Sequence, residues 1–177
     1  FAHYDYWDDE VRRSILFDSR ADLLVYGMGE RQIISIAENL DNGLDAEYIR
    51  HIPGTCYIIN NIEDVYGYKK LDSYEDVASD KEKYAKTFKV QYEEQDPIRG
   101  NILIQKHNDR YLVQNPPAEQ LDREMMDLIY SLPYQRDYHP VYKKAGGVPA
   151  IREVKFSITS SRGCYGGCSF CALNFHQ

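Results

Sequence analysis

A short apolar segment that runs through glycines into an amphipathic helix most limits the fold of this chain. Residues 21–26 (ADLLVY) form a compact apolar run that ends at Gly27-Met28-Gly29. Residues 30–40 then place four apolar side chains on one helical face: Ile33, Ile36, Ala37 and Leu40. A buried strand that passes through a glycine turn into a helix is typical of doubly wound α/β domains, in which the strands are parallel. We therefore predict a partial α/β module of this kind over residues 1–60.

Two further short elements are predicted within the same module. Residues 8–17 carry Val11, Ile15 and Leu16 at helical spacing, with acidic residues at the start, and this pattern indicates a short helix. Residues 56–59 (CYII) follow turn-forming residues and indicate a short strand.

The organisation changes after residue 60, and residues 61–150 are predicted to form an intervening region. Apolar residues at helical and strand periods are separated there by Pro, Gly and charged residues. The predicted elements are, in order, an exposed helix (73–94), a β-hairpin (102–104 with 111–113), a helix (119–130) and a linker (134–149).

The final region, residues 151–177, begins with an alternating segment. Residues 153–158 (EVKFSI) predict a strand, and the chain then enters a cysteine-rich loop. Residues 172–177 resemble the start of a helix, and the chain begins with Phe1 instead of Met. We therefore expect the sequence to be a fragment of a longer protein.

The composition bears on the compartment and on possible partners. The 177 residues carry a formal net charge of −7, and 43% of them are apolar. Such a balance is typical of a folded, soluble protein and does not indicate nucleic-acid binding. No run approaches the roughly 18 consecutive apolar residues that a membrane span needs. We expect a cytoplasmic protein that has no membrane partner.

Three of the four cysteines lie within eight residues of each other near the end of the chain. Cys164, Cys168 and Cys171 have the spacing C-x-x-x-C-x-x-C on a loop that also contains Gly166 and Gly167. Three thiolates on one short loop repel each other and oxidise readily, so they make chemical sense chiefly around a soft metal centre. The glycines would allow the backbone to curl around such a centre.

The number of ligands separates the possible metal centres. A structural zinc site needs four ligands, for which His176 is a candidate fourth. A ferredoxin-type cluster needs four cysteines, but Cys56 lies in a distant apolar run and is predicted to be a plain buried thiol. Three cysteines alone would leave one iron of a four-iron cluster without a protein ligand.

The cysteine spacing, with Phe170 just before the last cysteine, resembles that of the radical SAM superfamily. The wider text resembles the YgiQ-type radical SAM proteins over nearly all 177 residues, through FAHYDYWDDEVRRSILFDSRADLLVYGMGERQI, IPGTCY, QNPPAEQL, SLPYQRDYHPVY and the cysteine loop. This resemblance implies that Cys164, Cys168 and Cys171 bind a [4Fe-4S] cluster. It also implies that S-adenosylmethionine chelates the fourth iron, with Phe170 beside the adenine and Gly166 and Gly167 close to the cofactors.

The resemblance further implies a domain order and an activity. Residues 1–60 would be an incomplete cobalamin-domain-like module, and residues 151–177 would begin a partial (β/α) barrel. The full-length protein would be an enzyme that generates a 5′-deoxyadenosyl radical, with electrons from a reductant such as flavodoxin or ferredoxin. The substrate is not indicated, and the fragment alone is expected to be inactive. The alternative is a zinc-stabilised binding module without catalysis.

Overall fold

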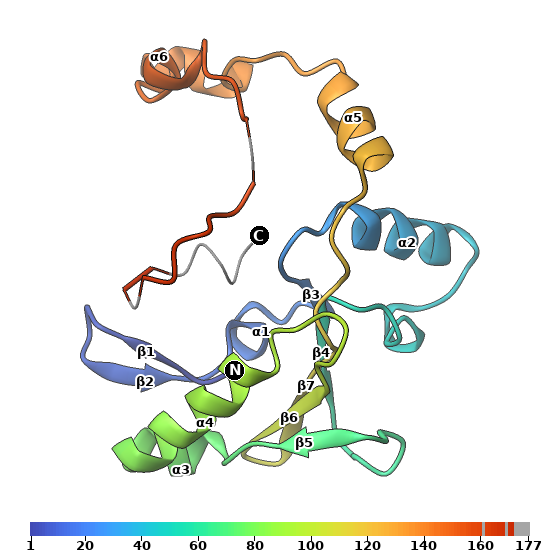
Figure 1. Ribbon diagram of the computed structural model, residues 1–177, viewed down its shortest axis with the longest axis vertical. Helices are drawn as coiled ribbons and strands as arrows, with labels where there is room; N and C mark the ends of the chain where they lie inside the picture. Colours follow the sequence, from blue (N-terminus) through green and yellow to red (C-terminus); the bar gives the residue numbers. More distant parts are fainter. Residues whose placement is uncertain (161, 169, 172–177) are drawn as a thin grey trace. The chain divides into compact units, whose positions relative to one another are not determined.

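The computed structural model describes residues 1–160, 162–168, 170 and 171. The chain divides into two compact units, the first over residues 1–120 and the second beginning at Leu121. The first unit contains a two-stranded hairpin and a five-stranded sheet with the order β3-β4-β7-β6-β5 (Figure 1). Its strands are β1 (His3–Asp5), β2 (Glu10–Arg12), β3 (Leu23–Val25), β4 (Thr55–Ile59), β5 (Tyr68–Lys70), β6 (Ile102–His107) and β7 (Arg110–Gln114).

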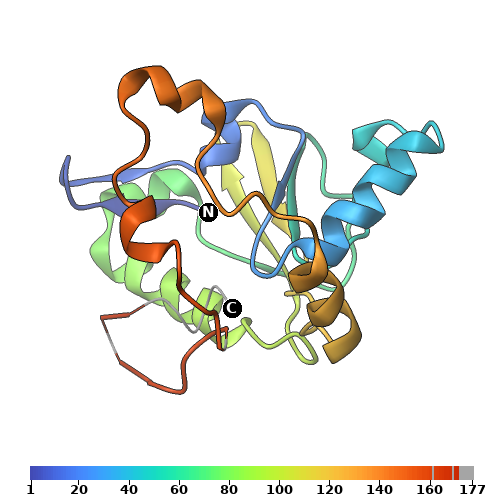
Figure 2. The ribbon, with the colours of Figure 1, turned by 90° about the horizontal axis from the view of Figure 1, so that it is seen from above.

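The helices of the first unit cover both faces of the five-stranded sheet. They are α1 (Ile15–Ser19), α2 (Glu30–Asp41), the 3-10 turn η1 (Ala46–Tyr48), α3 (Tyr74–Ser79) and α4 (Lys81–Glu93). On one face, Leu16 and Phe17 of α1 pack against Cys56 and Leu112. On the other, Ile36 of α2 packs with residues of the η1 segment and β3. Figure 2 shows α2 and the α3–α4 pair on opposite sides of the sheet.

The mixed α/β class is confirmed, but the pairing of β3 differs from the predicted doubly wound arrangement. β3 pairs antiparallel with β4, and only β5 and β6 are parallel. The connection between the two strands explains this pairing. After β3 the chain forms α2, and residues 44–53 then run back to the end of β3. β4 therefore begins beside the last residue of β3, where the Tyr26 amide donates a hydrogen bond to the Gly54 carbonyl over 2.9 Å. Gly54 makes this turn in the left-handed region, at φ +75°.

The short helix predicted over residues 8–17 is wrong in its first half. Glu10–Arg12 forms β2, which pairs with β1, and the helix begins only at Ile15 with Ser14 as its N-cap. The guanidinium of Arg12 lies against three carboxylates of the hairpin, on Asp5, Asp8 and Glu10. The pairing with β1 and these ion pairs within the hairpin outweigh the weak helical periodicity.

The helix predicted over residues 73–94 is present, but it is divided at Asp80. Asp80 ends α3, and its carboxylate accepts hydrogen bonds from the amides of Glu82 and Lys83 at the start of α4. The predicted hairpin is confirmed as β6 and β7, with Asn108 and Asp109 in the turn. The strand prediction at residues 56–59 is also confirmed, within β4.

The second unit contains helix α5 (Arg123–Ser131), the 3-10 segment η2 (Pro140–Ala145) and helix α6 (Ile151–Val154). The strand predicted over residues 153–158 is wrong, because Ile151–Val154 is helical and no strand follows among the described residues. A strand needs a neighbour for its backbone hydrogen bonds, and the described part of this unit offers none. No helix of the described chain is both long enough and apolar enough to cross a membrane.

A buried histidine gives the first unit a specific dependence on pH. His107 is only 2% exposed and stacks between Phe17 and Tyr74, with ring centroids 4.5 and 5.4 Å away. Burial lowers the pKa of His107 to about 4, below the value near 6.5 of an unfolded histidine. The unfolded chain therefore binds the proton more readily, and stability is lost as the pH falls from about 6.5 to 4.

We expect the free energy of unfolding to decrease by roughly 2 kcal/mol over this range because of His107. Urea unfolding of the wild type and of His107→Gln at several pH values measures the difference, since the carboxylates titrate in both proteins. Parallel pH profiles for the two proteins would contradict this assignment.

Candidate metal centre

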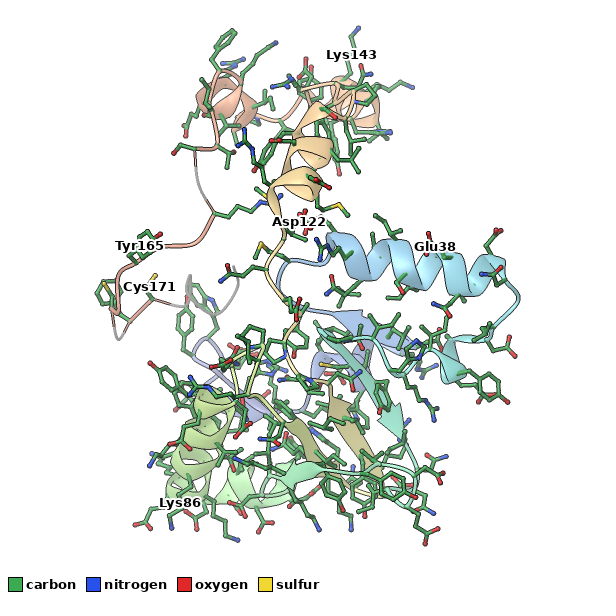
Figure 3. All side chains as sticks on the ribbon, turned by 45° about the vertical axis from the view of Figure 1, so that its right-hand side comes forward. Glu38, Lys86, Asp122, Lys143, Tyr165 and Cys171 are labelled. Carbon is green, nitrogen blue, oxygen red and sulfur yellow. The ribbon has the colours of Figure 1, made fainter. Side chains whose placement is uncertain are left out.

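The cysteine loop occupies residues 162–171 and has no regular secondary structure in its described part. Gly163 begins it at φ +78°, a conformation that residues with a Cβ rarely adopt. Figure 3 labels Tyr165 and Cys171 on this loop, and Tyr165 is fully exposed to solvent. Cys164, the residue after this glycine, is exposed.

Two of the three cysteine sulfurs flank Gly166. The Gly166 amide donates a hydrogen bond to the Cys164 sulfur over 3.3 Å. A Cβ placed on Gly166 would be 3.4 Å from the Cys164 sulfur and 3.5 Å from the Cys168 sulfur. Nothing lies within 4 Å of a Cβ placed on Gly167. Of these two glycines, Gly166 is thus the one whose backbone lies close to the thiols.

The third cysteine follows after a tight turn. The Cys171 amide donates to the Cys168 carbonyl over 3.1 Å, and the Cys171 side chain is half-buried. Phe170 beside it is 90% exposed. Within the described part of the loop and of the remaining chain, no three His, Cys, Asp or Glu side chains are grouped closely enough to hold a metal ion. The assignment of the three cysteines as ligands therefore stays a prediction.

The donor set nevertheless suits an iron–sulfur cluster in its chemistry. Three thiols on one short loop can all serve as thiolate ligands, and a backbone amide already donates to one of the sulfurs. Cys164 and Cys168 are exposed, so a cluster could reach them without unfolding a core. The residues present fit the group that the sequence resemblance implies.

Arg162 at the start of the loop is held by an aromatic residue of α5. Its Nε lies 3.4 Å from the Tyr130 hydroxyl, and its guanidinium carbon lies 5.7 Å from the centre of the Tyr130 ring. Tyr130 was not identified from the sequence, because 32 residues separate it from Arg162 and no local pattern connects them. This contact attaches Arg162, the first residue of the loop, to helix α5.

The fourth cysteine has a different environment. Cys56 lies in β4 at 6% exposure and contacts the Gln114 side chain, with 3.9 Å between sulfur and Oε1. Burial raises the pKa of the Cys56 thiol to about 12. The prediction of a plain buried thiol is confirmed. His176 and the helix start predicted over residues 172–177 lie outside the described residues.

The comparison with protein families decides the wider relationship. The model of the Radical SAM N-terminal family matches residues 1–157 of the chain. The chain belongs to this family. The resemblance to radical SAM proteins that the sequence motifs indicated is therefore confirmed. The match ends seven residues before Cys164, so it covers the first unit and α5 to α6 but not the cysteine loop.

Relatives of this Radical SAM N-terminal chain extend the similarity through the cysteine loop. A UPF0313 protein from Clostridium perfringens (strain SM101 / Type A) is 60% identical over 178 residues, which cover 100% of this chain and 27% of that protein. A UPF0313 protein from Clostridium botulinum (strain ATCC 19397 / Type A) is 57% identical over 177 residues, with the same coverage. The chain thus spans about a quarter of the length of these curated relatives. No solved structure matches it significantly.

Proposed function

We propose that the chain is part of a radical SAM enzyme whose [4Fe-4S] cluster is bound by Cys164, Cys168 and Cys171. The observation that carries this proposal is the position of the three-cysteine loop, directly after the segment that matches the Radical SAM N-terminal family. Three protein ligands leave one iron of the cluster for the amino and carboxylate groups of S-adenosylmethionine. When bound, the cluster would pass one electron from the reductant to the sulfonium of S-adenosylmethionine, which would supply methionine and a 5′-deoxyadenosyl radical able to abstract a hydrogen atom from the substrate.

The residues of the loop have distinct roles in this proposal. Gly166 brings its amide to the Cys164 sulfur, and such hydrogen bonds influence the reduction potential of a cluster. Phe170, which is 90% exposed, offers a free ring for the adenine of S-adenosylmethionine. Arg162 is held on Tyr130 and orients the first residues of the loop.

The segment before the loop supports an extension of the fold. Val154, Phe156 and Ile158 alternate along the sequence and are 56%, 90% and 90% exposed. Large apolar side chains exposed in a row are usually covered in the functional protein. We propose that further residues of the full-length protein cover them, as strands and helices of a partial (β/α) barrel.

The proposal includes two partners of the full-length protein, an unidentified substrate and a one-electron reductant such as flavodoxin or ferredoxin. Cys164 and Cys168 are exposed, and this exposure supports electron exchange between a bound cluster and a docked reductant. The loop residues of this chain hold and orient the cofactors, and the chemistry of the substrate depends on residues outside this chain.

The experiment is anaerobic reconstitution of the full-length protein with ferrous iron and sulfide. We expect about four iron and four sulfide atoms per chain, and cleavage of S-adenosylmethionine to 5′-deoxyadenosine on reduction. Iron analysis, the electron paramagnetic resonance spectrum and chromatography of the nucleoside measure these outcomes. One tightly bound zinc per chain, with no cleavage of S-adenosylmethionine, would instead identify a zinc-stabilised binding module.

A further inference from the structure

The first unit contains a cavity of about 610 Å³ that is lined by arginines. It lies where β4 ends and β7 begins, beside α1 and the η1 segment. Its charged lining consists of Arg13, Arg20, Arg50 and Arg110, together with the carboxylates of Asp22 and Glu47. Four of the 11 arginines line the cavity, and none of the 10 lysines does. The lining therefore carries four guanidinium groups and two carboxylates, on a chain with a net charge of −7.

Two of these guanidinium groups lie on aromatic rings. The Arg110 guanidinium carbon lies 5.0 Å from the centre of the Phe17 ring, and that of Arg50 lies 5.5 Å from the centre of the Tyr57 ring. Phe17 and Tyr57 are 7% and 6% exposed, so both rings are fixed in the core. A guanidinium stacked on a ring keeps its N–H edge free for an oxyanion.

The backbone at Arg50 and Arg110 is also fixed, by a hydrogen bond and by strand pairing. The buried Asn115 side chain donates to the Arg50 carbonyl over 2.9 Å, and the preceding Ile49 is fully buried. Arg110 is the first residue of β7 and pairs with the buried His107. A site built on fixed elements needs little ordering when a ligand binds.

The charges of the arginines are only partly balanced by the protein. Arg13 pairs with Asp18 at 2.5 Å, whereas Arg20, Arg50 and Arg110 make no ion pair with a carboxylate of the described chain. Arg20 also sits at φ +56°, in the left-handed region where glycine is the favoured residue at a helix end.

The composition of the lining indicates the chemical class of the ligand. Arginine binds phosphate through two parallel hydrogen bonds, and a phosphate group carries more charge than a carboxylate. The carboxylates of Asp22 and Glu47 can accept hydrogen bonds from sugar hydroxyls, and Asn60 adds a polar amide. A volume of about 610 Å³ is within the range of small-molecule sites. We infer that this cavity binds a nucleoside phosphate, with its phosphates on the arginines.

Calorimetric titration of the full-length protein with ADP, pyrophosphate and adenosine tests this inference. We expect ADP to bind most tightly, pyrophosphate to bind more weakly and adenosine not to bind. Arg50→Ala and Arg110→Ala should each weaken ADP binding at least tenfold, and the double variant at least a hundredfold. Arg50→Lys should recover only part of the loss, because lysine cannot form the paired hydrogen bonds.

Arg20→Gly separates binding from folding. Glycine relieves the left-handed backbone, so the variant should melt at the same or a higher temperature, while its affinity for ADP falls at least threefold. Arg123→Ala is the matched control, because Arg123 is exposed in α5 and outside the cavity. It removes the same charge and should leave ADP binding within twofold of the wild type.

No described residue of the cysteine loop lines the cavity, so the Cys164→Ala variant should bind ADP as tightly as the wild type. S-adenosylmethionine carries no phosphate and should not displace ADP. Equal affinity for ADP and pyrophosphate would overturn the nucleoside part of the inference and identify inorganic diphosphate as the ligand. Absence of ADP binding at millimolar concentration, or affinities unchanged in the arginine variants, would overturn the site itself.

Discussion

Cys164→Ala, Cys168→Ala and Cys171→Ala, each made in the full-length protein, are expected to abolish binding of the four-iron cluster. Each variant removes one of the three proposed protein ligands, and a cluster held by two thiolates is not expected to be retained. Iron content after anaerobic reconstitution should fall from about four atoms per chain to well below one. Cleavage of S-adenosylmethionine should fall at least about a thousandfold, since the ligands act as a unit.

Cys56→Ala is the matched control for these three variants. Cys56 is buried in β4, far from the loop in the sequence, and burial raises the pKa of its thiol to about 12. The control should bind iron and cleave S-adenosylmethionine like the wild type, with only a small loss of stability. If Cys56→Ala lost the cluster as completely as the loop variants, or if a loop variant kept all four irons, the proposed ligand set would be refuted.

Ile104→Ala is expected to cause a large loss of stability. Ile104 is completely buried in β6 and packs with Tyr57, Ile59 and Val113. Truncation to alanine removes buried apolar surface and leaves a cavity, which together cost about 3 to 4 kcal/mol in a well-packed core. Urea unfolding, followed by far-ultraviolet circular dichroism, measures the change in midpoint and slope.

Two further substitutions give reference values for the loss of stability in Ile104→Ala. Ile104→Val should cost only about 1 kcal/mol, because it removes a single methyl group from the same site. Ile158→Ala, made in this 177-residue chain, should change stability by less than about 0.5 kcal/mol, since Ile158 is 90% exposed. An Ile104→Ala variant as stable as Ile158→Ala would show that the β6 core is not packed as described.

The elements that the sequence predicts well are those with strong local patterns. The strand at residues 23–25, the helix at 30–41 and the hairpin around Asn108 and Asp109 all occur where periodicity and turn residues place them. The direction of pairing between β3 and β4 could not be predicted, because it depends on the return of residues 44–53 along α2. The proposed boundaries at residues 60 and 150 remain predictions.

The two candidate sites differ sharply in how they can be predicted. The cysteine loop is contiguous in the sequence, so its spacing alone identifies the thiols. The arginines of the cavity are spread from residue 13 to residue 110, between elements with no common motif. Arg110 begins β7, whereas the Arg50 carbonyl is bonded by Asn115 just after β7 ends, so it is the packing around β4 and β7 that brings both side chains to one cavity. The tyrosine that holds Arg162 was missed for the same reason.

The contrast between one buried and two exposed cysteines lets thiol labelling report on unfolding of the protein. A thiol reagent added to the metal-free chain should label Cys164 and Cys168 within the mixing time. Cys56 reacts only when β4 separates from its neighbours, so its labelling rate follows the opening of the sheet. Mass spectrometry of peptides from a single timed labelling reaction would thus give both the accessibility of the loop and the lifetime of the core.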